Sequence, residues 1–161
     1  MKVSRRSVLK AGAAGAALVA LGPSFAQEYP EDYPLTVIGN VNDLEVGQAV
    51  YFTYPDGRSQ GILVKLGKEA VAGVGPERDI VAYSAACTHM GCGVQYKNER
   101  FVCPCHNSMF DPAVNGQVYQ GLAATYLPQI GLRLNDQTGE LSAAFVEGVI
   151  WGRVDNVLSQ S

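Results

Sequence analysis

Two short blocks contain every cysteine and every histidine of this 161-residue chain. The first block is residues 87–92 (CTHMGC) and the second is residues 103–108 (CPCHNS). Each block pairs a thiol with an imidazole at a spacing that metal ligands use, C-x-H in the first and C-x-x-H in the second, and adds one further cysteine. Thiolates and imidazoles bind zinc and iron, and cysteines also form disulfides. The two blocks therefore predict a metal site or a disulfide site.

Simpler explanations of the two blocks fit the sequence less well. Two structural disulfides would use all four cysteines, but they would give no reason for both histidines to flank them. A zinc site with two cysteines and two histidines would leave two cysteines unexplained. The C-x-x-C-H spacing of a c-type haem site and the C-x-x-C spacing of a thioredoxin site are both absent from the sequence. An exported structural domain that binds zinc is the non-redox alternative.

The order and spacing of the blocks resemble the Rieske iron–sulfur motif, which has the form C-x-H-x-G-C followed by C-x-C-H-x-S. The resemblance implies one [2Fe-2S] cluster, with two thiolates on one iron and two imidazoles on the other. The four implied ligands are Cys87, Cys103, His89 and His106. The remaining pair, Cys92 and Cys105, would form a disulfide that ties the two loops together.

The residues that follow the second histidine bear on the reduction potential. In high-potential members of the Rieske family, a serine two positions after this histidine bonds a bridging sulfide, and a tyrosine two positions further on bonds a ligand thiolate. Ser108 matches the serine, whereas Phe110 stands in the place of the tyrosine. The missing hydroxyl should lower the potential relative to tyrosine-bearing relatives. Asn107 replaces the usual glycine, and the sequence assigns no effect to this change.

The mixed ligand set has an electrochemical consequence. Two ferric ions, two sulfides and two thiolates sum to zero charge when both imidazoles are neutral, whereas a cluster with four thiolates carries a charge of about −2. An electron adds more easily to the neutral centre, which gives potentials of roughly −150 to +300 mV, against about −400 mV for plant-type clusters. One nitrogen of each imidazole would bind iron and the other would face solvent, so we expect reduction to be coupled to histidine protonation at alkaline pH. A potential that does not change with pH in that range would refute the coupling.

Segments outside the two blocks resemble the small-subunit family of arsenite oxidase over residues 36–157. The matching pieces are 51–56 (YFTYPD), 64–67 (VKLG), 73–76 (GVGP), 79–84 (DIVAYS), 127–130 (LPQI) and 148–153 (GVIWGR). This resemblance implies a non-catalytic electron-transfer subunit, paired with a large molybdopterin subunit that carries a [3Fe-4S] cluster and oxidises arsenite. Electrons would pass through the Rieske cluster to a periplasmic cytochrome c or azurin. The exposed His89 and His106 would contact one of these electron partners.

Other Rieske proteins are alternatives to this interpretation. Iodate reductase has a related small subunit through which electrons run in the opposite direction, so the large subunit decides between the two activities. The Rieske subunits of quinol-oxidising cytochrome complexes carry an uncleaved membrane anchor and a Gly-Pro-Ala-Pro loop, but residues 121–124 (GLAA) lack the prolines. Rieske ferredoxins of ring-hydroxylating dioxygenases are cytosolic and lack the disulfide pair.

The first 26 residues are expected to be an export signal. Residues 4–10 (SRRSVLK) resemble the twin-arginine motif, an apolar stretch follows over 11–21, and small residues permit cleavage after Ala26. This stretch would span roughly 16 Å as a helix, against ~30 Å for a bilayer core. We therefore expect no stable membrane span, with a retained N-terminal anchor as the alternative. The twin-arginine route exports proteins that have folded around a cofactor in the cytoplasm, which predicts a periplasmic protein.

Charge and length limit the remaining possibilities. The whole chain has 12 basic and 15 acidic residues, for a net charge of −3. Removing the signal takes away four basic residues, which leaves 8 basic against 15 acidic residues in 27–161, a net charge of −7. Such an acidic domain is not expected to bind nucleic acid. One Rieske domain is expected over 27–161, with its cluster-binding part at about 85–128.

Short apolar runs separated by turn signals predict a mainly β fold. The expected strands are 49–54, 61–66, 79–84, 100–102, 117–119, 130–134, 140–146 and 149–154. Only residues 42–47 are expected to form a helical turn. Strands of this length and spacing are typical of antiparallel sandwiches and barrels. With the resemblance, they predict a Rieske-type antiparallel β sandwich or barrel and a small cluster-binding subdomain formed by two loops.

Overall fold

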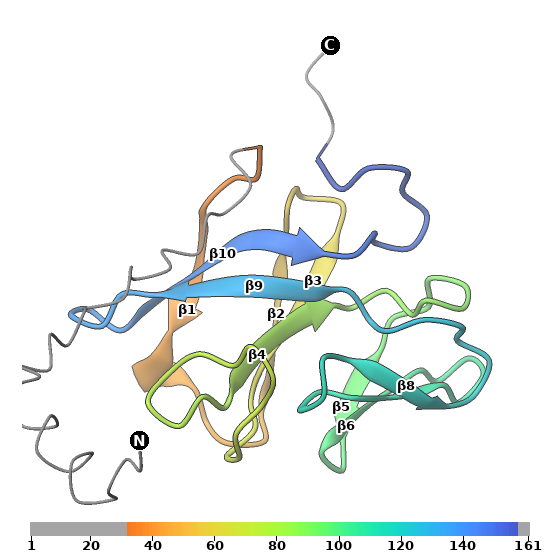
Figure 1. The fold of residues 1–161 in the computed structure, drawn as a ribbon, viewed down its shortest axis with the longest axis horizontal. Coiled ribbons are helices and arrows are strands. Elements are labelled where there is room, and N and C mark those ends of the chain that lie inside the picture. Colours follow the sequence, from red (N-terminus) through yellow and green to blue (C-terminus); the bar gives the residue numbers. More distant parts are fainter. Residues whose placement is uncertain (1–31, 158–161) are drawn as a thin grey trace, which may run out of the picture.

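The computed structural model describes residues 32–157, and strands dominate them (Figure 1). The elements are β1 (Thr36–Asn40), the 3-10 helix η1 (Val41–Asp43), β2 (Ala49–Thr53), β3 (Gln60–Lys65), β4 (Ile80–Ser84), β5 (Gln95–Lys97), β6 (Arg100–Val102), β7 (Met109–Asp111), β8 (Gln117–Gln120), β9 (Gln129–Leu134) and β10 (Glu140–Glu147). The predicted mainly β, antiparallel fold is confirmed. Within residues 32–157, no helix has the length and apolar character needed to cross a membrane. The expected signal at 1–26 lies outside the described residues.

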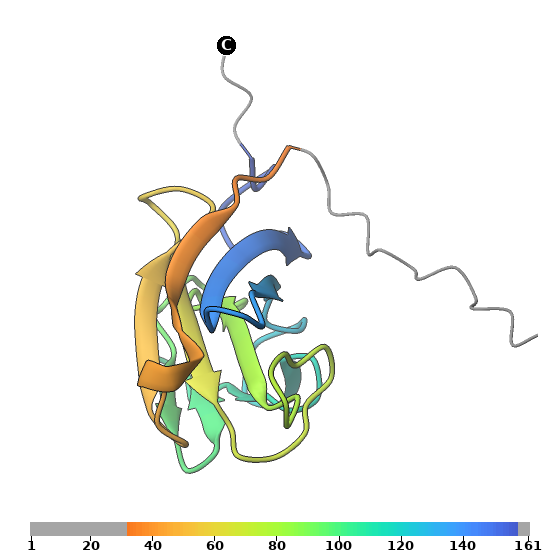
Figure 2. The ribbon, with the colours of Figure 1, turned by 90° about the vertical axis from the view of Figure 1, so that its left-hand side faces the viewer.

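The larger sheet has six strands in the order β1-β10-β9-β4-β3-β2, with antiparallel neighbours. Figure 2 shows that this sheet curves around an interior. The strands β3 and β4 are buried on both faces, which explains why they are continuous apolar runs without alternation. Leu63 and Ala82 pack into the core enclosed by the large sheet, whereas Ile62 and Tyr83 pack toward the second sheet.

The second sheet has four short strands in the order β5-β6-β7-β8 and lies at one end of the large sheet (Figure 1). Its strands all come from the chain between β4 and β9. Aromatic side chains join the two sheets, because the ring of Tyr83 on β4 packs edge-on against Phe101 on β6 with centroids 5.4 Å apart. The Tyr83 hydroxyl also donates to the carbonyl of Pro112 at 2.9 Å. These two contacts attach the small sheet to the large one.

The strands predicted from the sequence differ from the structure in a few places. The prediction of a strand at 149–154 is wrong, because Gly148 and Gly152 adopt positive φ angles of 88° and 81° and the segment forms turns. The side chain of Asn156 bonds to the backbone of these turns, so no partner strand is needed. The prediction missed β1, β5 and β7. The helical turn expected at 42–47 is the shorter helix η1, which begins one residue earlier.

Candidate functional site

The two cysteine blocks form two loops with the same backbone hydrogen bonding. The first cysteine loop, residues 87–92, connects β4 to β5, and the second cysteine loop, residues 103–108, connects β6 to β7. In each loop the amide of the first residue donates to the carbonyl of the sixth, at 2.9 and 2.8 Å respectively. The amide of the fifth residue donates back to the carbonyl of the first, at 2.8 and 3.0 Å. The chain therefore builds the same turn twice, and each copy presents a thiol and an imidazole.

The fifth position of each loop needs a left-handed backbone. Gly91 and Asn107 occupy this position, with φ angles of 73° and 54°. Glycine adopts such angles without strain, and asparagine tolerates them better than most other residues. The sequence alone assigned no effect to Asn107. The structure shows that asparagine replaces glycine at a left-handed position and preserves the turn. An alignment of the two blocks position by position shows that Asn107 in the second block corresponds to Gly91 in the first.

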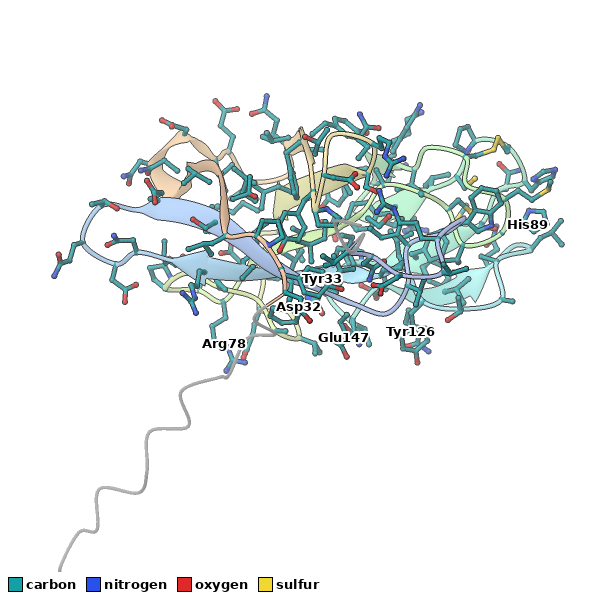
Figure 3. The ribbon with its side chains drawn as sticks, turned by 90° about the horizontal axis from the view of Figure 1, so that it is seen from above. Asp32, Tyr33, Arg78, His89, Tyr126 and Glu147 are labelled. Atoms are coloured by element: carbon teal, nitrogen blue, oxygen red, sulfur yellow. A yellow bond between two sulfur atoms is a disulfide. The ribbon has the colours of Figure 1, made fainter. Side chains whose placement is uncertain are left out.

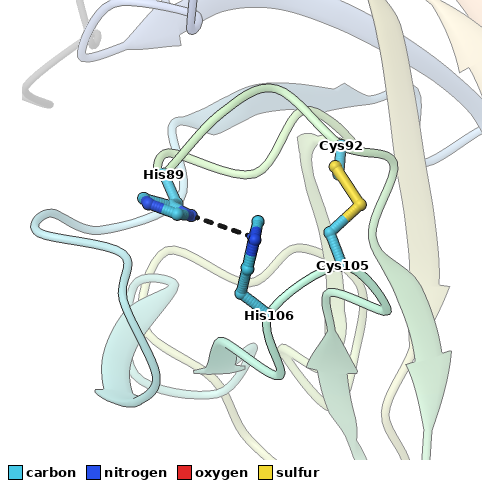
Figure 4. The surroundings of a disulfide bond; sticks show 4 residues. All are labelled: His89, Cys92, Cys105 and His106. Carbon is cyan, nitrogen blue, oxygen red and sulfur yellow. Dashed lines mark hydrogen bonds between the residues drawn. A yellow bond between two sulfur atoms is a disulfide. The ribbon is translucent and has the colours of Figure 1, made fainter.

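A disulfide joins the two loops, as Figure 4 shows. The S–S distance between Cys92 and Cys105 is 2.11 Å and their Cα atoms lie 6.5 Å apart. The bond connects the last residue of the first cysteine loop to the third residue of the second. It therefore fixes the position of one loop relative to the other.

The other two cysteines are free thiols in the protein interior. Cys87 and Cys103 are 0% and 1% exposed and belong to the apolar cluster between the two sheets. Burial raises the pKa of the Cys87 thiol, and the neighbouring thiol of Cys103 raises it further. The backbone amide of His89 and the hydroxyl of Ser108 donate to the Cys87 sulfur, and these bonds lower its pKa in part. A buried pair of thiols with donors already aimed at one sulfur is suited to binding a metal as thiolates.

One further grouping of sulfur atoms is not a ligand set. The sulfur of Cys103 and the sulfurs of Cys92 and Cys105 lie within 4.8 Å of one another. The last two are bonded to each other, so neither offers a thiolate to a metal. The free thiols among the described residues are those of Cys87 and Cys103.

The two imidazoles face each other at the edge of the molecule. The Nδ1 atoms of His89 and His106 lie 3.2 Å apart, and the ring planes are almost perpendicular at 84° (Figure 4). The ring of His106 is exposed and that of His89 is partly exposed. Figure 3 shows His89 at one end of the molecule. Both Nδ1 atoms thus point into the space between the two loops.

The donor atoms fit a binuclear iron–sulfur cluster. Two sulfurs approach from the interior and two imidazole nitrogens approach from the surface side, one of each from each loop. Thiolates and imidazoles are donors that suit an iron–sulfur group, and these residues would hold such a group between the interior and the surface. A single zinc ion would use the same four donors, so the donor set alone does not distinguish the two metals.

Ser108 attaches a third segment, residues 121–128, to the site. Ser108 is fully buried, and its Oγ accepts hydrogen bonds from the amides of Leu122 and Ala123 at 3.1 and 3.0 Å. Because amides occupy both acceptor positions, the hydroxyl hydrogen is left to donate toward a sulfur. Gly121 allows this close approach, since a Cβ there would lie 2.3 Å from the Cα of Ser108. The sequence prediction missed these two amides because every residue except proline can supply a backbone amide.

Phe110 makes one wall of the site apolar. This side chain on β7 is fully buried in the same cluster as the two free thiols, and it lies opposite Phe101 on β6 and Val118 on β8. A phenyl ring donates no conventional hydrogen bond. The ring therefore contributes packing to the apolar cluster that contains the thiols and leaves hydrogen bonding to Ser108 and the backbone.

Comparisons with known proteins agree with this geometry. The family model for the Rieske [2Fe-2S] domain matches residues 36–130, and that for the twin-arginine translocation signal matches residues 2–22. The chain is 40% identical to iodate reductase subunit IdrB of Denitromonas iodatirespirans over 96% of this chain and 86% of that protein. It is 37% identical to IdrB of Pseudomonas sp. strain SCT over 93% of this chain and 82% of that protein. The soluble domain of the Rieske protein II (soxF) from Sulfolobus acidocaldarius has a similar fold, with a TM-score of 0.69 at 20% identity, covering 79% of this chain and 85% of that one.

Proposed function

The chain belongs to the Rieske [2Fe-2S] domain family, and from this premise we propose that it is the electron-transfer subunit of a molybdenum enzyme of the iodate reductase type. It binds one Rieske cluster and carries a twin-arginine signal for export to the periplasm. The observation that supports an electron-transfer role is the convergence of two buried thiols and two surface imidazoles from loops joined by a disulfide. The proposed ligands are Cys87, His89, Cys103 and His106.

The roles of the protein groups follow from their positions. The bound cluster supplies one-electron exchange. The buried thiols keep the inner side of the site away from water, and the exposed imidazoles bring its outer side to the molecular surface. The hydroxyl of Ser108 and the amide of His89 donate to the Cys87 sulfur and favour its thiolate form. We propose that the surface around His89 and His106 contacts one electron partner.

Iodate reductase is the better-supported of the two related activities. The segments between 36 and 157 led us to expect arsenite oxidase, with iodate reductase as an alternative. Two iodate reductase subunits match almost the whole chain at 40% and 37% identity, which supports the alternative. Under this proposal, a large molybdopterin subunit reduces iodate, and this chain passes electrons to it from a periplasmic cytochrome c or a similar carrier. The segment at 121–124 lacks the two prolines expected of a quinol-oxidising complex.

Metal and sulfide analysis tests the cluster. Protein exported by its own signal should contain iron and acid-labile sulfide in equal amounts. Its reduced form should give the EPR spectrum of a [2Fe-2S] centre with mixed thiolate and imidazole ligands. His89→Cys should move the spectrum toward that of a centre with more thiolate ligands. Zinc without sulfide would overturn the proposal in favour of a structural zinc domain.

Copurification tests the activity. The large subunit that copurifies with this chain should contain molybdenum, and the complex should oxidise a reduced dye when iodate is added. Arsenite-dependent reduction of a cytochrome c or of azurin, with no response to iodate, would support arsenite oxidase instead. A complex lacking this chain should lose electron exchange with the protein carrier while keeping turnover with small dyes, because under this proposal the large subunit binds the substrate.

A further inference from the structure

The C-terminal hook, residues 148–157, is a closed turn fixed by a buried side chain. Asn156 is only 4% exposed, and its Oδ1 accepts from the amide of Ile150 at 2.9 Å. Its Nδ2 donates to the carbonyl of Gly148 at 2.6 Å and to the hydroxyl of Tyr33 at 3.1 Å. Hydrogen bonds within the hook and to the segment before β1 therefore stabilise this conformation.

Arg153 attaches the hook to the connection between β2 and β3. Its Nη2 donates to both carboxylate oxygens of Asp56, at 2.7 and 2.9 Å, and its Nη1 donates to the carbonyl of Asn156 at 2.9 Å. The Arg153 side chain is 13% exposed, so this ion pair is partly shielded from solvent. The hook is thus anchored at both ends of its turn, on the large sheet rather than on the cysteine loops.

The anchored hook places an indole ring on the first cysteine loop. A Cβ added to Gly91 would lie 2.3, 2.6 and 3.0 Å from three ring atoms of Trp151, so the ring rests directly against the Gly91 backbone. The amide of Gly91 donates to the carbonyl of Cys87 at 2.8 Å and closes the loop. The ring therefore covers the residue on which the conformation between Cys87 and Cys92 depends.

Packing in the buried core does not explain the position of the Trp151 ring. Trp151 is 46% exposed and belongs to neither of the two buried apolar clusters. It lines a groove of about 670 Å³ together with Gly91 and Gly93, on the surface between the hook and the first cysteine loop. An aromatic ring that leaves half its area in water contributes less to stability than a buried one. Its defined contact is with the loop that carries two of the proposed ligands.

We propose that Trp151 is a positioning residue that holds the first cysteine loop, and with it Cys87 and His89, in the conformation that binds the cluster. This inference rests on the proposed ligand role of that loop. The indole contacts the loop at Gly91, the residue whose amide closes the turn on the carbonyl of Cys87. It limits opening of the loop because the hook behind it is fixed by Arg153 and Asn156.

The first test measures hydrogen exchange in the first cysteine loop of the metal-free protein. In the metal-free protein, Trp151→Ala should speed hydrogen exchange of the Gly91 amide by about tenfold, whereas Trp151→Phe should retain most of the protection. Val154→Ala is the matched control, since Val154 lies in the same hook and is fully exposed. Equal exchange in Trp151→Ala and the wild type would overturn the proposal. If Trp151→Ala does not fold, Trp151→Leu replaces it, because leucine removes the ring from Gly91 and leaves the strained backbone of the loop unchanged. Exchange in Trp151→Leu equal to that of the wild type would then overturn the proposal.

The second test measures the EPR line width of the bound cluster and its rate of iron loss. Trp151→Ala should broaden the EPR lines and lose iron to a chelator several-fold faster than the wild type, and Trp151→Phe should restore both. Because the chain has a single tryptophan, its fluorescence reports on this ring alone, and cluster binding should quench it in the wild type. A wild-type protein without iron and sulfide would refute the proposed function. A wild-type protein with a cluster, in which Trp151→Ala changes neither the EPR lines nor iron loss, would refute only the positioning role.

Discussion

Replacing both disulfide cysteines by serine is expected to destabilise the protein by about 3 kcal/mol. The bond between Cys92 and Cys105, which are 13 positions apart, closes a loop in the unfolded chain. Closing a loop of this length costs an entropy worth about 3 kcal/mol at 25 °C. Cys105 is exposed and Cys92 is half-buried, so the serine hydroxyls keep access to water and add little desolvation cost. For a domain of this size, that free energy corresponds to a fall in Tm of roughly 9–15 °C.

Urea and thermal unfolding of the metal-free protein measure this loss without a contribution from the cluster. Both cysteines are changed together, because a single remaining thiol beside Cys103 could bind iron or oxidise. Wild-type protein whose disulfide has been chemically reduced is the matched control, and it should lose the same free energy as the double variant. A loss below about 1 kcal/mol in both would refute the reasoning. It would mean that the loops are already fixed by their backbone hydrogen bonds and that the unfolded chain is compact.

Three further predictions concern single residues. Phe110→Tyr should raise the midpoint potential by about 40–60 mV, because the new hydroxyl would add one hydrogen bond of about 1 kcal/mol that favours the reduced state. Voltammetry measures the potential, and an unchanged value would show that the hydroxyl does not reach a sulfur. Asn107→Ala should have a free energy of unfolding about 1 kcal/mol below that of Asn107→Gly, because alanine is strained at a φ of 54°; equal values in urea titrations would contradict this. Asp56→Asn should lower stability at pH 7 by about 1 kcal/mol, since the hydrogen bond from Arg153 holds the pKa of Asp56 below its ordinary value in the folded protein. That stabilisation is present above the ordinary carboxyl pKa and disappears as the pH falls through the lowered one, so unfolding curves of wild type and variant should converge in acid.

The parts of the fold that the sequence predicted are those with a local signal. The strands β3 and β4 are buried on both faces and stand out as unbroken apolar runs. The strands β5 and β7 have three residues each, too few to show a period, and they form because neighbouring strands pair with them. The run at 149–154 has the composition of a strand, yet two glycines and a distant asparagine make it a hook.

The residues of the site can likewise be separated into those with a local sequence signal and those without one. Residue type and spacing singled out the two cysteine blocks, and the resemblance to the Rieske motif supplied the proposal of which four side chains are the donors. The groups that position the donors carry no such signal. The amides of Leu122 and Ala123, which bond to Ser108, are common to nearly all residues, and the contact of Trp151 with Gly91 joins positions 60 apart in the chain. Such contacts depend on the tertiary fold, which a motif does not describe.

The neighbours of the first cysteine loop share a chemical property that matters for electron transfer. On its different sides the loop meets the disulfide, the Ser108 hydroxyl, the Trp151 indole and the carbonyl of Thr125, which accepts from the Thr88 hydroxyl at 2.8 Å. None of these groups titrates in the physiological pH range. A centre that gains and loses one electron changes its charge at every turnover, and a titrating neighbour would answer each change by moving a proton and shifting the potential. Fixed dipoles and an apolar ring would hold the ligands through both states, so we expect these four groups to add no proton coupling of their own.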